Sequence, residues 1–330
     1  MKVGILGFGI MGKIRKQCIE NTQNWEVIKI YDLFLENIPN KLIATSANDI
    51  LFDISIDVIF ICTPNKYNFE YTKIALMNGK DVFCEKPPAF TSVEVLEIKE
   101  IEKSSKKKLM YGFNHRHHQS IQLMKSYIDE KKFGNIIWMR GRYGKSVDDD
   151  FFENWRADEN FSGGGILLDQ GIHMLDLFLY FKPDLEAHSA LVTNYFWKRN
   201  IEDNVFANLK SKNGNVIASL HSTMTQWRHL FSLEIFLEEG YLTLNGLITS
   251  SGSYGKETLT IAKNRTKAPR ATWNDEESIT FETDDFWQRE VDYFVEKVNN
   301  SKPIEFCNSN DAYNVMKEIE KIYLIGKNFI

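Results

Sequence analysis

The sequence predicts an α/β protein in two parts: a doubly wound parallel sheet, then an α+β domain with a large, open, mostly antiparallel sheet. Two observations carry this prediction. Residues 1–113 alternate short apolar strands with helices, as a parallel sheet requires. From residue 187 to residue 281, strand-like segments recur with turns between them. A chain of 330 residues is long enough for two cores, which we place at 1–118 and 119–330, with the last helix able to pack back on the first domain.

Composition excludes several classes of protein. A net charge of −5 argues against a surface for nucleic acid or anionic membranes, and no apolar run reaches the ~20 residues of a membrane span. The chain enters a strand at Val3 without a charged and apolar leader, so we expect no signal peptide. Its four cysteines lack metal-ligand spacing, which indicates reduced thiols in a cytoplasmic protein and no metal site.

A glycine-rich turn follows the first predicted strand, Val3–Leu6, and opens a helix. The turn reads Gly7-Phe8-Gly9-Ile10-Met11-Gly12, and Asp32 lies 20 residues after its last glycine, at the end of the strand Val27–Tyr31. This order of strand, turn, helix and acid is the dinucleotide-binding pattern of a Rossmann domain. The helix N-terminus would meet the pyrophosphate and Asp32 the adenosine ribose, which favours NAD over NADP. The alternative is a glycine-rich turn without a ligand.

The other predicted parallel strands end on polar residues, at the sheet edge where ligands of such folds bind. Strands Val58–Ile61, Asp81–Cys84 and Lys108–Phe113 are followed by Thr63, Pro64, Asn65, Glu85, Lys86 and Asn114. A lysine just after a strand is usually a solvent-exposed structural residue. Lys86 also precedes two prolines that stiffen its backbone and falls where the nicotinamide should lie, so the second interpretation is a hydrogen-bond donor or acid.

A buried helix is predicted from Leu168 to Tyr180, shortly after three consecutive glycines. On a 3.6-residue period one stripe of this helix is polar and consists of Asp169, His173, Asp176 and Tyr180. Ionisable groups inside a buried helix are costly unless they are paired or used. Two interpretations stay open: a core histidine satisfied by the aspartate one turn before it, or a proton-transfer site. Gly171, opposite this stripe, indicates close approach of another backbone.

The rest of the second part is predicted as follows. A helix (121–131) and a strand (135–143) come first. A polar loop (145–160) follows, and we interpret its acidic run, Asp148-Asp149-Asp150, as solvated. Strand segments follow at 187–197, 204–210, 216–224, 231–238, 241–244, 258–261 and 278–281, with loop tips at 250–255 and 263–270. Asn213-Gly214 predicts a hairpin turn, and two helices at 287–298 and 310–325 close the chain.

Together these motifs resemble the glucose–fructose oxidoreductase, inositol dehydrogenase and MocA family (Gfo/Idh/MocA), over essentially the whole chain. The resemblance rests on the glycine turn at 7–12, Thr63-Pro64-Asn65, Glu85-Lys86-Pro87, and Gly163-Gly164-Gly165 running to Asp169, Gly171, His173 and Asp176. It implies a Rossmann domain followed by an α/β domain whose open sheet forms subunit contacts. One position departs from the family pattern, because a histidine often stands where this chain has Asn68.

The resemblance implies an oxidoreductase that interconverts a sugar hydroxyl and a ketone with a nicotinamide dinucleotide. By position, Lys86, Asp169 and His173 correspond to the family's catalytic set. A neutral His173 would take the hydroxyl proton, Lys86 would stabilise the developing negative charge, and Asp169 would orient the ring or bond a neighbouring hydroxyl. Asp176 is interpreted as structural. The residues expected to bind the cofactor are Gly7, Phe8, Gly9, Ile10, Met11, Gly12, Asp32, Thr63, Pro64, Asn65, Glu85 and Lys86.

The substrate is expected to be a sugar or sugar derivative, held by planar side chains and fixed donors and acceptors. The candidates are Asn114, Arg116, Trp155, Arg156, Asp169 and His173. The two arginines suit a carboxylate or phosphate, which favours a uronate or nucleotide-linked sugar over an inositol. Alternatively, Arg156 braces the acidic run or the domain interface.

Three functional classes compete. The leading one is an NAD-dependent sugar dehydrogenase or reductase. The second is a redox-neutral enzyme, such as the family's glycosidases, which oxidises its substrate transiently and then eliminates a group. The third is a dinucleotide-binding regulator without turnover, which should lack the lysine or the histidine.

We also expect a homodimer or homotetramer, because an open sheet with aromatic residues leaves one face to cover.

Overall fold

The computed structural model describes residues 1–34, 39–263, 272–283 and 285–326, and the chain divides into two compact units. The first comprises residues 1–114, 160–163 and 286–317, and the second comprises 115–159, 164–285 and 318–330. The predicted boundary at 118 differs slightly from the observed one after Asn114. A larger difference concerns residues 286–317, which were expected in the second domain and belong to the first unit, where α8 (Phe286–Asn299) packs on α1 (Ile10–Glu20).

The first unit is built on a parallel sheet of five strands in the order β2-β1-β3-β4-β5. Its strands are β1 (Lys2–Leu6), β2 (Glu26–Tyr31), β3 (Val58–Ile61), β4 (Asp81–Cys84) and β5 (Leu109–Tyr111). Every residue of β3 and β4 is buried, as expected for strands covered on both faces. The predicted Rossmann-type sheet is confirmed.

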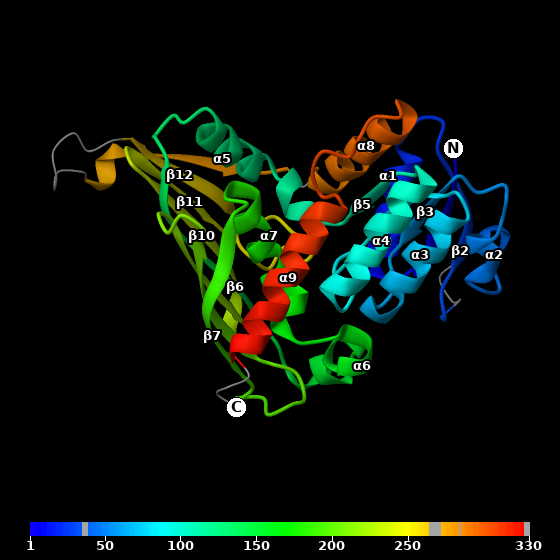
Figure 1. Ribbon diagram of the computed structural model, residues 1–330, viewed down its shortest axis with the longest axis horizontal. Helices are drawn as coiled ribbons and strands as arrows, with labels where there is room; N and C mark the ends of the chain where they lie inside the picture. Colours follow the sequence, from blue (N-terminus) through cyan, green and yellow to red (C-terminus); the bar gives the residue numbers. More distant parts are fainter. Residues whose placement is uncertain (35–38, 264–271, 284, 327–330) are drawn as a thin grey trace. The chain divides into compact units, whose positions relative to one another are not determined.

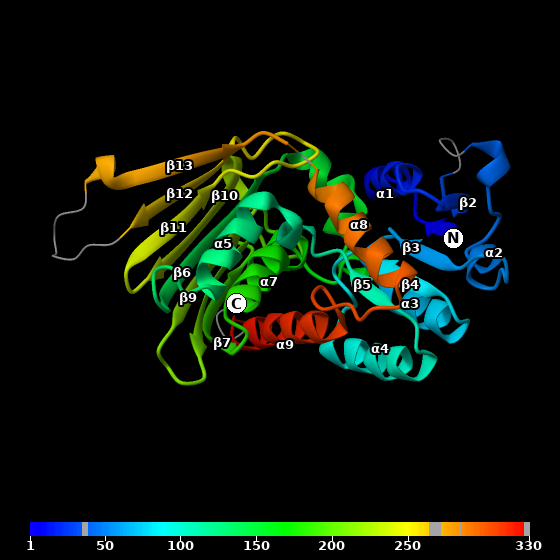
Figure 2. The same cartoon turned by 90° about the horizontal axis from the view of Figure 1, so that it is seen from above.

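Helices cover both faces of this sheet, with α1 and α8 on one side and α3 (Asn68–Met77) and α4 (Ser92–Ser105) on the other (Figures 1 and 2). A short helix, α2 (Asn48–Leu51), precedes β3. Phe60 and Phe83 stack with ring centroids 5.0 Å apart, and Phe294 of α8 packs edge-on against both. The sheet core is therefore closed partly by residues from near the end of the chain.

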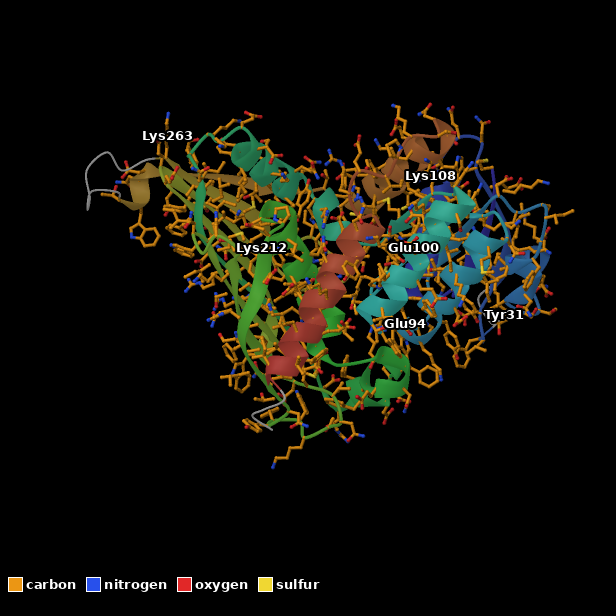
Figure 3. The ribbon with its side chains drawn as sticks, in the orientation of Figure 1. Tyr31, Glu94, Glu100, Lys108, Lys212 and Lys263 are labelled. Atoms are coloured by element: carbon orange, nitrogen blue, oxygen red, sulfur yellow. The ribbon has the colours of Figure 1, made fainter. Side chains whose placement is uncertain are left out.

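A capping box starts α4. The Thr91 side chain accepts a hydrogen bond from Glu94 N at 3.2 Å, and the Glu94 carboxylate accepts one from Thr91 N at 2.8 Å. Glu94 and Glu100 lie along this helix in Figure 3, and Glu100 is exposed. The polar outer face and the buried Val95 and Ile98 explain why this segment forms a surface helix of the sheet.

The second unit is built on a sheet of eight strands in the order β13-β12-β11-β10-β6-β9-β8-β7, antiparallel except where β6 pairs with β9. The strands are β6 (Ile136–Ser146), β7 (Leu185–Thr193), β8 (Asn204–Ser211), β9 (Ile217–Thr223), β10 (Thr225–Leu237), β11 (Gly240–Asn245), β12 (Glu257–Lys263) and β13 (Glu276–Phe281). The predicted open, mostly antiparallel sheet is confirmed. Its residues alternate between buried and exposed, as β8 shows most clearly.

One face of this sheet is covered by helices α5 (Gln119–Asp129) and α7 (Ile172–Phe181), as Figure 2 shows. At Gly141 of β6 an added Cβ would lie 2.4 Å from the Met174 sulfur, which indicates how closely α7 approaches the strand. The helix α9 (Ser309–Gly326) contributes residues to both units. None of the helices described is long and apolar enough to cross a bilayer.

The connecting segments are partly as predicted. The Asn213-Gly214 turn joins β8 to β9, with Gly214 at a φ of +76°. The segment predicted as a polar loop at 145–160 begins inside β6 and contains short helices at Asp149–Glu153, Trp155–Ala157 and Glu159–Ser162. The loop tip expected at 263–270 lies, from residue 264 on, outside the described residues.

Candidate active site

The glycine-rich turn of the first unit leads from β1 into α1. Gly7 has a φ of +87°, and a Cβ there would lie 2.5 Å from the Cys62 carbonyl oxygen. A Cβ at Gly12 would lie 2.1 Å from the Gly7 oxygen, so both positions require glycine for close packing. At Gly9 a Cβ would meet no atom within 4 Å. Gly9 therefore leaves an open approach to the N-terminus of α1, which fits a bound pyrophosphate.

Asp32 follows β2 and contacts the same turn. One of its carboxylate oxygens accepts a hydrogen bond from Phe8 N at 2.5 Å, and the other accepts one from Phe34 N at 2.9 Å. The acid predicted to meet the adenosine ribose is thus fixed beside the glycine turn. The neighbouring Leu33 is 67% exposed and offers no positive charge to a 2′-phosphate.

The segment around Lys86 is held by Asn68, the position at which the chain departs from the family pattern. Asn68 is fully buried, and its amide donates to the carbonyl oxygens of Glu85 at 3.2 Å and Pro87 at 2.8 Å. The Thr63 hydroxyl in turn donates to Asn68 Oδ1 at 3.2 Å. These bonds fix the backbone on both sides of Lys86, and the Lys86–Pro87 peptide bond is cis. Asn65, also predicted at this edge, donates to Ser162 O at 2.8 Å.

The Glu85 side chain forms part of a buried ion-pair cluster. Arg15 Nε donates to Glu85 Oε1 at 2.8 Å, and Arg15 also pairs with Glu290 at 2.6 Å. The guanidinium stacks over the rings of Phe83 and Trp287 at 4.4 and 4.8 Å. Glu85 was predicted to bind the cofactor, but its carboxylate is used inside the first unit. We therefore give it a structural role.

In the second unit, the predicted buried helix begins with a π-helical turn, Leu167–Gly171, before α7. Periodicity alone predicted a regular α-helix here. Buried Glu202 holds the start of this turn, because its carboxylate accepts from Gly165 N at 2.8 Å, Leu167 N at 2.9 Å and the Tyr323 hydroxyl at 2.8 Å. Gly171 packs against the side chains of Leu167 and Ser222, and not against another backbone as expected.

Asp169 projects from the π-helical turn toward two cations. Lys145 of β6 forms an ion pair with Asp169 Oδ2, and Arg156 Nε lies 3.9 Å from Oδ1. Arg156 is 39% exposed at its side chain and stacks on the Trp155 ring at 4.5 Å. The predicted residues Trp155, Arg156 and Asp169 therefore come together in the second unit, with Lys145 as an addition that the sequence did not indicate.

His173, on α7, lies in a cluster of aromatic residues. Its ring stacks on His115 with centroids 4.0 Å apart and an interplanar angle of 12°. His115 Nε2 is 3.1 Å from the Tyr143 hydroxyl, and the ring centroids of Tyr143 and Tyr254 are 5.3 Å apart. Burial raises the pKa of Tyr143 well above its usual value, so this phenol stays protonated. His173 is thus buried against the rings of His115 and Tyr143.

Arg116, predicted to bind substrate, is engaged elsewhere. It is 2% exposed and donates to both carboxylate oxygens of Asp176, at 2.8 and 2.6 Å, while stacking on Tyr180 at 4.6 Å. Because a carboxylate already compensates this buried guanidinium, the expectation that it receives a substrate anion is withdrawn, and the pair fits the interpretation of Asp176 as structural. Asn114 is also buried, with 6% exposure.

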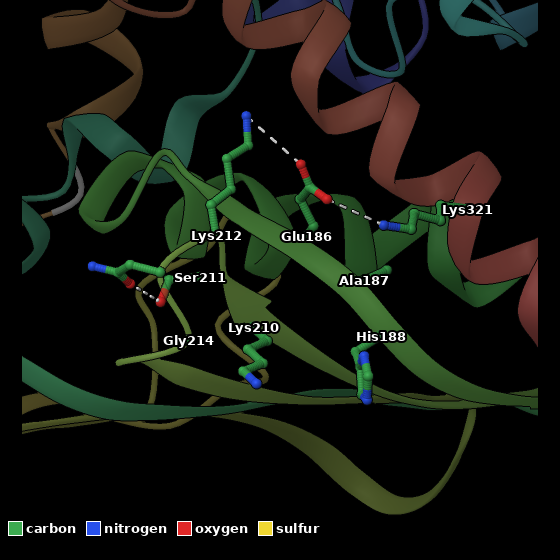
Figure 4. Close-up of a pocket in the computed structure, with 9 residues that line it drawn as sticks. Glu186, Ala187, His188, Lys210, Ser211, Lys212, Gly214 and Lys321 are labelled. Carbon is green, nitrogen blue, oxygen red and sulfur yellow. Dashed lines mark hydrogen bonds and ion pairs between the residues drawn. The ribbon is translucent and has the colours of Figure 1, made fainter.

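Two cavities in the second unit contain none of the predicted site residues. One, of about 350 Å³, is lined by Glu186, Ala187, His188, Lys210, Ser211, Lys212, Asn213, Gly214 and Lys321. In Figure 4, Glu186 lies between Lys212 and Lys321, whose Nζ atoms are 3.7 and 3.5 Å from its carboxylate oxygens. Lys210 and His188 point away from it. The other, of about 730 Å³, involves the end of α5 and the start of β6. Among the described residues, no cluster of potential metal ligands occurs.

The residues of the candidate site that sequence reasoning did not single out are Lys145, Tyr143, Tyr254 and Glu202. Lys145 continues β6, whose predicted end came too early, so its strand periodicity was a usable signal. Glu202 lies 35 residues from Leu167 along the chain, and no local pattern connects the two.

A Rossmann-type unit with a glycine-rich turn and an acid after β2, together with a second sheet unit carrying Asp169 and His173, defines a two-domain class of dinucleotide-binding protein. Two family models match the chain. The model of the oxidoreductase family with an NAD-binding Rossmann fold covers residues 1–113, and the model of the GFO/IDH/MocA C-terminal domain covers residues 121–243. The chain belongs to the Gfo/Idh/MocA oxidoreductase family.

Known relatives include sugar dehydrogenases. The chain is 28% identical to D-glucoside 3-dehydrogenase of Escherichia coli (strain K12) over 190 residues, covering 54% of this chain and 53% of that protein. It is also 28% identical to glucose-6-phosphate 3-dehydrogenase of Bacillus subtilis (strain 168) over 198 residues, 57% of this chain and 56% of that protein. The matched segments thus span about half the length of these relatives.

The fold has solved counterparts. Levoglucosan dehydrogenase, solved with NADH and levoglucosan, superposes with a TM-score of 0.86 at 21% identity, covering 99% of this chain and 97% of that one. This similarity concerns the fold of both units.

Proposed function

We propose that the protein is an NAD-dependent oxidoreductase that interconverts a secondary hydroxyl and a ketone on a sugar or sugar derivative. The observation that carries the proposal is the presence, in one chain of this family, of an open glycine cradle at Gly9 and of Asp169 and His173 on a buried helix. The dehydrogenases among its relatives favour this class over a redox-neutral enzyme or a regulator.

The proposed catalytic residues are Lys86, Asp169 and His173. When bound, the nicotinamide dinucleotide supplies hydride chemistry. His173 takes the hydroxyl proton at a ring nitrogen, since a neutral imidazole is a base near neutral pH. Lys86 donates a hydrogen bond that stabilises the negative charge on the same oxygen. Asp169, held by Lys145, orients the site or bonds a neighbouring hydroxyl.

For the cofactor we propose NAD over NADP. Asp32 fixed beside the glycine turn supports this, because its charge repels a 2′-phosphate while its oxygens accept from ribose hydroxyls. Residues 7–12, Thr63, Pro64 and Asn65 complete the proposed cofactor site. The four cysteines, all free thiols, fit a reducing cytoplasm, which we propose as the location.

For the substrate we propose a sugar that carries a carboxylate or a phosphate, free or within a nucleotide. With Arg116 withdrawn, the support comes from Lys145 and Arg156, two cations that share the single carboxylate of Asp169. The Arg156 side chain is 39% exposed and only loosely paired, 3.9 Å from Asp169, and Trp155 beside it offers a planar ring to a sugar face. Asn114, which is buried, is the weakest member of the proposed set.

The test is a turnover panel with NAD, read at the reduced-nicotinamide absorbance band. It should cover free sugars, inositols, uronates, sugar phosphates and nucleotide sugars. We expect reduced nicotinamide with an anionic sugar, and a larger rise in KM for that substrate in Arg156→Ala than in the matched exposed variant Arg228→Ala. Turnover of inositols alone, with Arg156→Ala neutral, would overturn the anionic-sugar proposal. Consumption of substrate without net reduced nicotinamide would favour the redox-neutral class.

A further inference from the structure

The stacked rings of His115 and His173 limit how much charge this part of the second unit can hold. Their centroids are 4.0 Å apart and both residues are buried, with exposures of 3% and 6%. Two imidazolium ions at this distance repel each other strongly, because little water lies between them to screen the charge. Near neutral pH the pair therefore carries one positive charge at most.

The charged groups around the pair decide which ring is protonated. The titratable groups of the second unit on the surrounding elements include Asp169 and Asp176 on its own helix segment, Tyr143 and Lys145 of β6, Arg116 and His118 beside His115, His229 of β10, Tyr254, and Glu257 of β12. Asp169 is the carboxylate one turn before His173, but it is paired with Lys145 and close to Arg156. Asp176 is likewise neutralised by Arg116.

The surroundings of His115 favour a proton more than those of His173. His115 Nε2 faces the Tyr143 hydroxyl, whose oxygen can accept from a protonated ring. The next ring, His118, lies 5.6 Å from His115, and its Nδ1 is 2.9 Å from a Glu257 oxygen, so this end of the row is a compensated pair. Ser120 and Ile248 N also bond Glu257, which keeps that carboxylate in place.

We propose that His115 is a positioning residue for His173: stacked on it, His115 takes the one positive charge that the pair can hold and leaves His173 neutral. His173 is thereby kept ready to accept the substrate proton at pH values where an isolated imidazole would already be charged. This inference rests on the proposed function, in which His173 is the base.

The first experiment compares the pH dependence of kcat/KM in the wild type and in His115→Phe, which keeps a stacking ring without a titrating nitrogen. We expect the acid limb of the variant to move to higher pH by roughly half a unit or more, because His173 then titrates alone. His115→Gln should behave in the same way. Phe231→Leu, another ring packed on His115, is the control and should leave the limb in place.

The second experiment does not depend on activity. Histidine Cε1 resonances of the full chain, labelled with ¹³C, are followed by NMR as a function of pH. In the wild type, His115 and His173 should titrate as a coupled pair in two steps, and in His115→Phe the His173 curve should become a single step at higher pH.

Independent single-site curves for both histidines, or an acid limb unmoved in both His115 variants, would overturn the proposal. A structural defect alone would lower kcat/KM at all pH values without moving the limb. If His173→Ala keeps normal turnover, the proposed function fails instead, while the coupled NMR titration still reports on the ring pair.

Discussion

Arg15 and Glu290 form an ion pair at 2.6 Å in which both side chains are fully buried. Glu85 bonds the same guanidinium, so two carboxylates share one cation inside the first unit. Burial raises the pKa of Glu290 to about 8, and Arg15 opposes this effect only in part. The protonated form of Glu290 is therefore favoured by the fold relative to the unfolded chain.

The first prediction follows from this pKa. Because the folded state binds the extra proton, the contribution of Glu290 to stability is present below its usual pKa and is lost as the pH rises toward about 8. Glu290→Gln removes that dependence. Chemical denaturation at several pH values should show the wild type losing stability relative to Glu290→Gln between pH 5 and 8.5; a constant difference contradicts the prediction.

The same cluster predicts the effect of removing its cation. Arg15→Met should lower the free energy of unfolding by roughly 3–5 kcal/mol, since it leaves buried carboxylates without their cation.

The second prediction concerns Asn68, whose amide bonds the backbone on both sides of Lys86. Asn68→Ala leaves the carbonyls of Glu85 and Pro87 without this donor and should lower kcat by about tenfold or more, as the positioning of a catalytic group loosens. Affinity for NAD, measured by calorimetry, should change little. Asn68→His tests the residue common in the family and should retain more activity than alanine. Equal kcat in wild type and Asn68→Ala would remove Asn68 from the catalytic apparatus.

The third prediction is cofactor preference. Calorimetric titration should show tighter binding of NAD than of NADP, because Asp32 repels the 2′-phosphate. The double variant Asp32→Ser and Leu33→Arg should narrow or reverse the difference, since it exchanges a negative charge for a positive one at the exposed end of β2. Tighter NADP binding by the unmodified protein would refute this assignment.

The fourth prediction concerns the proposed catalytic residues. Lys86→Ala should slow the chemical step ~10²-fold or more, the scale of losing one charge-stabilising donor, and leave NAD affinity nearly unchanged. Lys103→Ala, an exposed lysine on α4, is the matched control. His173→Ala should abolish the acid limb of kcat/KM. Near-normal turnover in either variant means that its role has been misassigned.

The fifth prediction is assembly into a homodimer or homotetramer. The face of the eight-stranded sheet away from α7 carries exposed apolar residues, including Leu191, Phe206 and Ile217 at 48, 50 and 54% exposure. Light scattering should give a mass that is a multiple of the 38.4 kDa chain. Phe206→Glu should weaken the assembly, whereas Met77→Glu, at an exposed position of α3, should not. A monomer at micromolar concentration refutes the prediction.

The sequence was informative where burial is local. The strand at Val58–Ile61 is apolar throughout, because it is covered on both faces, and its predicted bounds match the structure. Asp32 and the glycine turn were likewise recognisable, since a strand, a turn and a helix adjacent in sequence create that environment.

Ion-pair partners could not be predicted in the same way. Arg116 was assigned to a substrate from its charge and position, but its partner, Asp176, lies 60 residues away and only the packing of α7 brings them together. Lys145 and Asp169 meet for the same reason, across 24 residues. Such pairs depend on which elements are neighbours in the fold, and hydrophobic periodicity does not encode that.

The π-helical turn at Leu167–Gly171 sets the spacing between Asp169 and α7. It places one more residue between Asp169 and α7 than a regular helix needs for the same advance. Deleting Gln170 would keep every proposed catalytic side chain and remove the extra residue, so a regular helix would span the same advance and the widened turn from which Asp169 meets Lys145 would be lost. The extra residue at this point, and not only side-chain chemistry, therefore shapes the backbone that presents the aspartate to its cation.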